Sequence, residues 1–137
     1  MANTRSKKST PYHKLARYLD TLPAGYPSTD SGVEIDLLKK LFTEREAALA
    51  LNLRLISEPT AVIAQRVGWP PEQVETLLDG MAHKGLISVS SDGEDTPRYA
   101  VSQFVIGFWE GQVNQLDQEA VELFEAYGPI WFDLGPW

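Results

Sequence analysis

The segment around Gly68 constrains the fold of this chain more than any other part of the sequence. Two helices that cross steeply need a small residue where their axes come closest, and Ala64 meets that need. Gly68 follows four residues later, where a tight turn requires a residue that accepts a positive φ. Pro71 then suits the first turn of a second helix, because its missing N–H would have no intrahelical partner there. The spacing therefore predicts a helix-turn-helix over residues 59–85.

A pair of strands is expected directly after this motif. Gly85 fits the end of the second helix, where a left-handed residue closes many helices. Residues 86–90 and 98–101 alternate apolar and polar side chains, and residues 91–96 between them are turn formers. Helix, turn, helix and hairpin is the element order of a winged helix, whose wing would span residues 86–102. We therefore expect a winged helix-turn-helix fold, mainly α with a small β-hairpin.

Apolar spacing predicts further helices on both sides of the motif. Residues 12–22 form the first of them, and Asp30 or Ser31 can cap a second. Thr43 and Glu46 have the spacing of a capping box, in which each side chain accepts a hydrogen bond from the other residue's backbone N–H. A third helix is therefore expected to begin there.

The C-terminal part is expected to be helical over residues 104–127, with Asp117 as an internal N-cap. Gly128 and Pro129 should then break the helix and free an aromatic tail. The expected organisation is a disordered basic arm at residues 1–10, a winged-helix domain with flanking helices at residues 11–127, and a tail at residues 128–137 that begins a linker to a missing C-terminal domain.

Charge is distributed unevenly along the chain, whose net charge is −7. Residues 1–19 carry five basic residues and no acidic one, so the rest of the chain is strongly acidic. A basic arm can contact phosphate, but a solvated, frayed terminus explains the same composition, and we favour the second interpretation.

The absence of cysteine excludes disulfides, thiolate zinc sites and iron–sulfur clusters held by this chain alone. The two histidines, His13 and His83, lie far apart in sequence, and no nucleophile stands beside a His–acid pair. We therefore expect no metal, no cofactor and no catalytic residues in this chain. The N-terminal residues are polar, so the sequence predicts no signal peptide. No apolar run approaches the roughly 20 residues that span a bilayer. We therefore expect a cytoplasmic protein with no membrane partner.

The exposed face of the second helix of the motif distinguishes two kinds of partner. A helix that reads DNA usually presents Arg, Lys, Asn or Gln. This helix carries Glu72, Glu75 and Asp79, and residues 59–102 hold three basic residues against six acidic ones. Because affinity for DNA depends on neutralising phosphates, the balance favours docking or dimerisation over DNA binding. The candidate DNA contacts, if DNA is bound, are Gln73, Thr76, His83, Lys84 and Arg98.

Aromatic residues are concentrated at the C-terminus. A core explains those at residues 104–124, but it explains the last ones less well, because a surface tail rarely carries two tryptophans without something to bury them. We therefore expect a second surface, most simply another copy of the chain, to cover Trp131, Phe132 and Trp137.

A series of motifs follows in order along the chain. They are LPAGYP at residues 22–27, SGVEI at 31–35, LKKLFT at 38–43, EAALAL at 46–51, IAQRVG at 63–68, MAHKGLI at 81–87 and QFVIGFWEGQV at 103–113. In this series the chain resembles, over residues 12–127, the N-terminal winged-helix region of bacterial and archaeal 4Fe–4S ferredoxin-type proteins. The cysteines that bind the cluster in that family have no counterpart here.

The resemblance implies that a 4Fe–4S cluster belongs to a missing C-terminal domain and that this part is a non-catalytic interaction module. Its partner would be a second copy of the chain, the cluster domain or an electron-transfer protein. The alternative is a DNA-binding regulator of the winged helix-turn-helix type, assisted by the basic arm.

Overall fold

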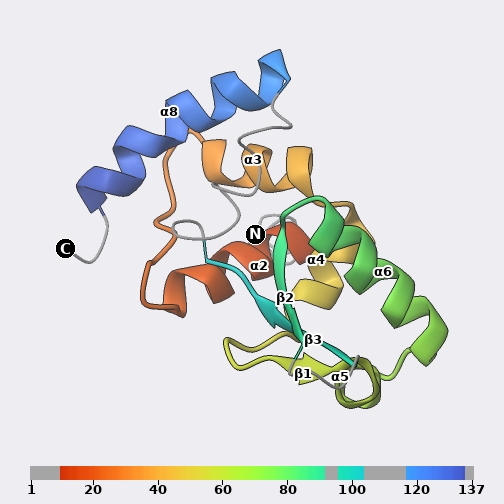
Figure 1. Ribbon diagram of the computed structural model, residues 1–137. Coiled ribbons are helices and arrows are strands. Elements are labelled where there is room, and N and C mark those ends of the chain that lie inside the picture. The colour runs from red at the N-terminus through yellow and green to blue at the C-terminus, as the bar shows by residue number, and fades with distance from the viewer. Residues whose placement is uncertain (1–9, 92–95, 104–116, 135–137) are drawn as a thin grey trace.

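The chain folds into a mainly helical structure with a small three-stranded antiparallel sheet (Figure 1). The computed structural model describes residues 10–91, 96–103 and 117–134. With the labels of Figure 1, the elements are α2 (Pro11–Thr21), α3 (Val33–Leu41), α4 (Glu44–Ala50), β1 (Glu58–Pro59), α5 (Thr60–Val67), α6 (Pro71–His83), β2 (Ile87–Ser91), β3 (Pro97–Val101) and α8 (Gln118–Leu134).

Helices α5 and α6 are joined by the short turn that the sequence predicted. Gly68 has a φ of 78°, and its N–H donates to the carbonyl of Ala64 at 2.8 Å, which closes α5. Pro71 begins α6. The facing sides of the two helices are buried, with Ile63 on α5 and Val74 on α6 fully enclosed. The two predicted helices and the turn between them are confirmed.

The end of α6 leads straight into the sheet. Gly85 has a φ of 76°, and the N–H groups of Gly85 and Leu86 donate to the carbonyls of Ala82 and Met81. This double hydrogen bond is a Schellman motif, and it turns the chain into β2. Strands β2 and β3 pair antiparallel as predicted, and Val89 lies opposite Tyr99. The connecting residues 92–95 lie outside the described part of the chain.

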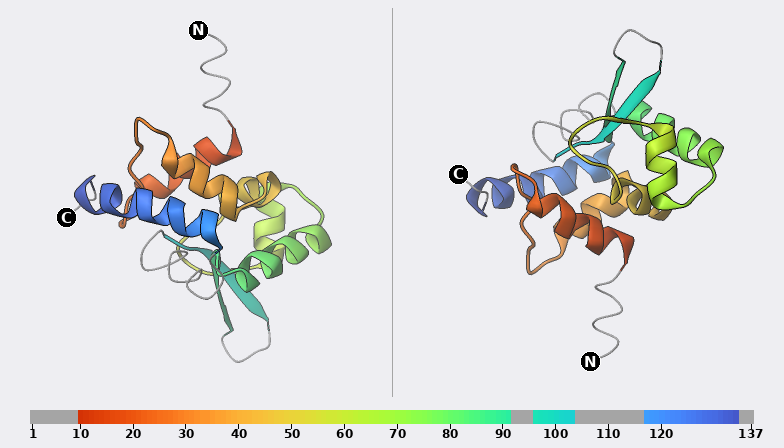
Figure 2. Two further views of the ribbon diagram at one scale, coloured as in Figure 1. Left: turned by 90° about the horizontal axis from the view of Figure 1, so that it is seen from above. Right: turned by 90° about the horizontal axis from the view of Figure 1, so that it is seen from below.

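The third strand, β1, was not predicted from the sequence. It pairs with β3, which gives the sheet order β1-β3-β2. It has only two residues, Glu58 and Pro59, too few for an alternating pattern to mark a strand. Figure 2 shows β2 and β3 extending away from the helices beside α6, while α8 lies on a different side of the molecule.

The N-terminal helices begin at side-chain caps. Thr43 and Glu46 form the predicted capping box at α4, with Glu46 N–H on the threonine Oγ1 at 3.1 Å and Thr43 N–H on the glutamate Oε1 at 2.9 Å. Helix α3 differs from the prediction, because its N-cap is Gly32 and not Asp30 or Ser31. The hydroxyl of Thr29 accepts from the N–H of Gly32 at 2.9 Å, and the N–H of Val33 lies 3.3 Å from the same oxygen and 3.4 Å from the Ser31 hydroxyl.

The predicted break at Gly128 and Pro129 is wrong, because α8 continues through both residues to Leu134. Proline removes one helical hydrogen bond, but tertiary contacts on each side hold the helix. The Tyr127 hydroxyl donates to the carbonyl of Pro27 at 2.7 Å, and Trp131 Nε1 lies 3.2 Å from the carbonyl of Ala24. The domain therefore does not end at residue 127, and residues 128–134 are not a separate tail.

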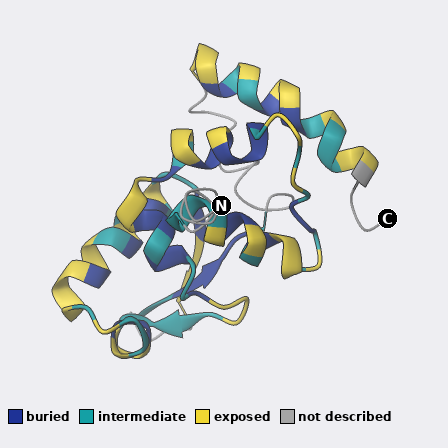
Figure 3. Ribbon diagram, turned by 180° about the vertical axis from the view of Figure 1, so that it is seen from behind, coloured by how far each residue is buried: buried dark blue, intermediate teal, exposed yellow. Residues whose placement is uncertain are grey.

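Helix α8 packs on α3, and its buried residues lie on the side toward that helix (Figure 3). The predicted cap at Asp117 is confirmed, since its Oδ1 accepts from the N–H of Ala120 at 2.8 Å. The expected helix at residues 104–116 lies outside the described residues. None of the described helices combines the length and apolarity needed to cross a membrane.

Candidate interaction surface on α6

Helix α6 presents a polar face with three carboxylates and no Lys or Arg. Its apolar residues Val74, Leu78 and Met81 are fully buried, and their spacing of four and three residues directs the intervening side chains outward. The exposed polar residues along the helix are Glu72, Gln73, Glu75, Thr76, Asp79 and His83. We call this set the α6 face.

Helix α6 lies beside β2 of the sheet, and its carboxylates act electrostatically on Tyr99 of the neighbouring strand β3. Burial first, and then the carboxylates of Asp79 and Glu75, raise the pKa of Tyr99. An exposed apolar residue, Val89, lies opposite Tyr99 on β2. The surface beside α6 thus combines negative charge with an apolar side chain.

The three candidate DNA contacts on the α6 face, Gln73, Thr76 and His83, make hydrogen bonds or close approaches within the chain. Gln73 Oε1 accepts from Arg45 at 2.7 Å. The Thr76 hydroxyl donates to the carbonyl of Glu72 at 3.0 Å, and His83 Nδ1 lies 3.0 Å from the carbonyl of Asp79. The last two contacts are local to α6, and both residues remain exposed.

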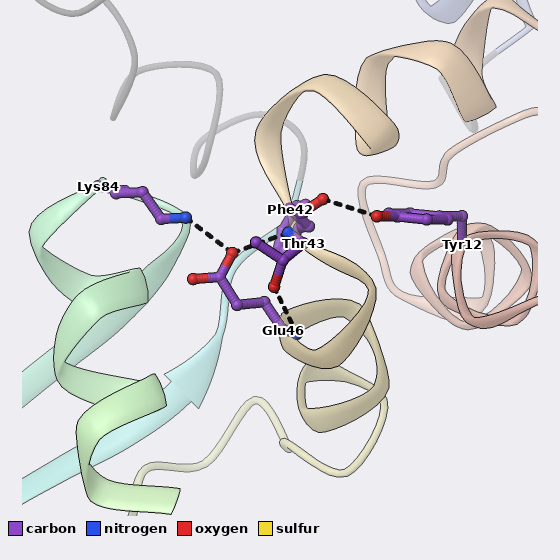
Figure 4. A network of polar contacts seen from close by, with 5 residues as sticks. All are labelled: Tyr12, Phe42, Thr43, Glu46 and Lys84. Atoms are coloured by element: carbon purple, nitrogen blue, oxygen red, sulfur yellow. Dashed lines mark hydrogen bonds and ion pairs between the residues drawn. The ribbon is translucent and has the colours of Figure 1, made fainter. Parts of the chain in front are cut away.

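Lys84 is directed toward α4 rather than along the α6 face (Figure 4). Its Nζ donates to Glu46 Oε1 at 2.7 Å, and the same oxygen accepts from the N–H of Thr43 in the capping box. Glu46 is buried, so the pair compensates a charge that would otherwise be enclosed without a cation. No local pattern could reveal this pair, since the two residues are 38 positions apart.

Arg98 lies on β3, paired with Ser90 of β2, and is half-buried. The structure therefore distributes the five candidates over α6, its C-terminal end and the sheet. It places Gln73, Thr76 and His83 on the α6 face. Lys84 belongs to the contact with α4.

Two further cations near the helix pair are also engaged inside the chain. The Arg45 guanidinium lies 4.0 Å from the centroid of the Trp69 ring, in addition to its bond to Gln73. Arg66 on α5 pairs with Glu58 on β1, and this hydrogen bond lowers the pKa of the Glu58 carboxyl. With Lys84, three described cations around α5 and α6 are therefore oriented toward internal partners.

The three aromatic residues expected at an interface differ in their exposure to solvent. Trp131 is half-buried and packs against the loop that contains Ala24 and Gly25. Phe132 is 66 % exposed on α8. Trp137 lies outside the described residues. Phe132 is thus the exposed residue among the described members of the set.

The residues of this chain do not fit an iron–sulfur cluster, because the sequence has no cysteine to supply thiolate ligands. In the described ranges, no three His, Asp or Glu side chains form a group that could hold a metal ion. His13 lies on α2 and His83 on α6, so the two histidines belong to different helices.

Comparison of the chain with protein-family models, with curated proteins and with solved structures gives no significant match.

Proposed function

We propose that this chain is a non-catalytic winged-helix module that docks on a basic protein surface through α6 and the β2–β3 pair. The order α4, β1, α5, α6, β2, β3 matches that of a winged helix, and the pairing of β1 with β3 supports the assignment. In this assignment α6 is the helix that a DNA-binding member would insert into the major groove.

The observation that carries the proposal is the charge of the α6 face. Glu72, Glu75 and Asp79 are exposed there, while Lys84 is paired with Glu46. A duplex presents phosphates to any helix that enters its groove, and phosphate contacts supply most non-specific affinity. Carboxylates at that position repel DNA and attract a basic protein surface.

The resemblance to 4Fe–4S ferredoxin-type proteins supports a partner in electron transfer. In that interpretation the module docks with a cluster-bearing domain or a redox protein, or pairs with a second copy of itself. It holds no cluster, since it has no cysteine. The module recognises its partner, and complementary charge on the two surfaces sets the association rate and the orientation in which they meet.

The proposal is tested by following backbone amide resonances of the full chain during two titrations at physiological salt. A hexalysine peptide should shift amides around Glu75 and Asp79 most strongly, and E75Q/D79N should remove those shifts. The matched control is E125Q on α8, which removes an exposed carboxylate away from the α6 face. Duplex DNA should shift only residues near the N-terminus, with a strong dependence on salt.

The alternative function, DNA binding, rests on the five basic residues within residues 1–19. A nanomolar, sequence-selective DNA complex that shifts α6 and survives deletion of residues 1–10 would refute the proposal. Mutation of Gln73, Thr76 and Arg98 would then identify the contacts with bases and phosphates.

A further inference from the structure

A hollow of about 420 Å³ lies between α2, α3 and the loop that connects them. Its inner wall is formed by the buried residues Ala16, Tyr26 and Ile35. Its other lining residues are polar or glycine: His13, Arg17, Asp20, Ser28, Thr29, Gly32 and Glu34. The volume lies within the range of small-molecule sites, and the mainly polar lining favours a polar or charged ligand.

The most informative lining residue is Glu34, which is only 4 % exposed. Its Oε1 accepts from Thr29 twice, from the backbone N–H at 3.1 Å and from the hydroxyl at 2.6 Å. Within the described residues the other carboxylate oxygen has no hydrogen-bond donor, and no Lys, Arg or His pairs with this side chain. Burial of a carboxylate without a cation costs folding free energy, so a positively charged group bound in the hollow would stabilise Glu34.

Asp20 adds a second carboxylate to the hollow from the last turn of α2. Its Oδ1 accepts from the N–H of Tyr26 at 2.9 Å, which fixes the side chain against the loop. Two carboxylates, Asp20 and Glu34, are too few for a protein metal site, in agreement with the absence of a metal-binding group in the described ranges. An ammonium group, which donates three hydrogen bonds, is the better partner for them.

Arg17 brings positive charge into the hollow from the middle of α2, and the His13 ring, nearer the start of the helix, has its Nδ1 2.5 Å from the hydroxyl of Thr10. His13, Arg17 and Asp20 follow the spacing i, i+4, i+7, which places them on one face of the helix. At 1.5 Å per residue, His13 and Asp20 are separated by about 10 Å along the axis. The side of the hollow lined by α2 therefore runs from basic to acidic side chains.

We propose that this hollow binds a small zwitterion of the amino-acid class. Its ammonium group lies at Glu34 and Asp20, and its carboxylate lies toward Arg17 and His13. The apolar wall of Ala16, Tyr26 and Ile35 contacts the carbon chain between the two charges. This site is separate from the α6 face, so it would add ligand recognition to the docking function.

The test uses three probes of similar length with the full chain: 6-aminohexanoate, hexanoate and hexylamine. Calorimetry and amide resonances should show saturable binding of 6-aminohexanoate, with shifts at Ser28, Thr29 and Gly32. The two single-charge probes should bind at least about tenfold more weakly. D20N and R17Q should each weaken 6-aminohexanoate by a similar factor. Asparagine at position 20 keeps the Oδ1 that accepts from the N–H of Tyr26, and the melting temperature checks the fold of both variants.

K14Q is the matched control, since Lys14 is exposed on the same helix and does not line the hollow. It should leave the affinity unchanged. E34Q keeps the shape of the buried side chain and removes its charge, so it should abolish binding. The melting temperature of E34Q checks that this variant is folded. If E34Q does not fold, the affinities of D20N and R17Q test the proposal. Equal affinity for hexylamine and 6-aminohexanoate, or no saturable binding of any probe, would overturn the proposal.

Discussion

Lys84 at the end of α6 and Glu46 in the first turn of α4 form an ion pair, with 2.7 Å between Nζ and Oε1. The glutamate oxygen also accepts the N–H of Thr43, so one buried carboxylate both caps a helix and connects two helices. The position of the α6 C-terminus therefore depends on a residue that the sequence marks only as a local cap.

Replacing Lys84 with Met should lower the free energy of unfolding by about 1 kcal/mol, as measured by urea denaturation. Methionine keeps the apolar stem and leaves Glu46 without its cation. The value is modest because the Lys84 side chain is 42 % exposed and water screens the pair. K14M removes an exposed lysine from α2 and should change stability by less than about 0.5 kcal/mol. Equal effects of the two variants would show that the pair does not contribute.

Two glycines offer a matched pair of substitutions with opposite signs. Gly68 has a φ of 78° and open space where a Cβ would stand, so G68A introduces backbone strain without a clash. It should lower stability by about 1 kcal/mol. Gly80 lies inside α6 with no atom within 4 Å of an added Cβ, so G80A should raise stability by roughly 0.5–1 kcal/mol. Thermal midpoints that move in the same direction would contradict the assignment of the turn.

The pair between Glu58 and Arg66 predicts a pH-dependent stability. The hydrogen bond from Arg66 lowers the pKa of Glu58 in the folded chain. The pair therefore stabilises the fold above the ordinary glutamate pKa of about 4.3, and the contribution is lost as the pH falls through the lowered folded value. E58Q should melt below the unmodified chain at neutral pH, and the difference should close in acid. E125Q, at an exposed site, should show no such convergence.

Trp131 and Phe132 are adjacent on α8 but should respond differently to substitution. W131F retains an aromatic ring and loses the indole N–H that lies near the carbonyls of Ala24 and Gly25. It should cost about 1 kcal/mol in urea denaturation. F132A removes an exposed ring and should leave the stability of the monomer within about 0.5 kcal/mol. If Phe132 contacts a second copy, light scattering should show a lower mass for F132A alone.

Local signals in the sequence predicted the structure correctly where a few neighbouring residues determine the backbone conformation. Gly68 needs a positive φ whatever surrounds it, and Thr43 with Glu46 caps α4 through bonds three residues apart. The cap at Asp117 is of the same kind. These features require no knowledge of the tertiary structure, and all three were predicted.

Features that depend on distant contacts were missed. The Gly128–Pro129 pair has the local signature of a break, but burial of Tyr127 on one side and contacts of Trp131 on the other keep α8 continuous. The hollow beside Glu34 needs α2 and α3 to be placed together, and the two-residue strand β1 needs β3 as its partner. Charge counts could predict an acidic α6 face, but not that Lys84 would point away from it.

The hydrogen bonds from α8 to the loop at residues 24–27 join parts of the chain 100 and 107 residues apart. Contacts between residues so far apart in sequence are expected to form later in folding than the local contacts of α5 and α6, and to open before them. Amide hydrogens of the 24–27 loop should therefore exchange through partial opening of α8, at a lower free energy than those of α5 and α6. The wall of the hollow at Tyr26 would then open while the α5–α6 pair stays folded. The hollow would therefore have a shorter lifetime in its closed form than the α6 face.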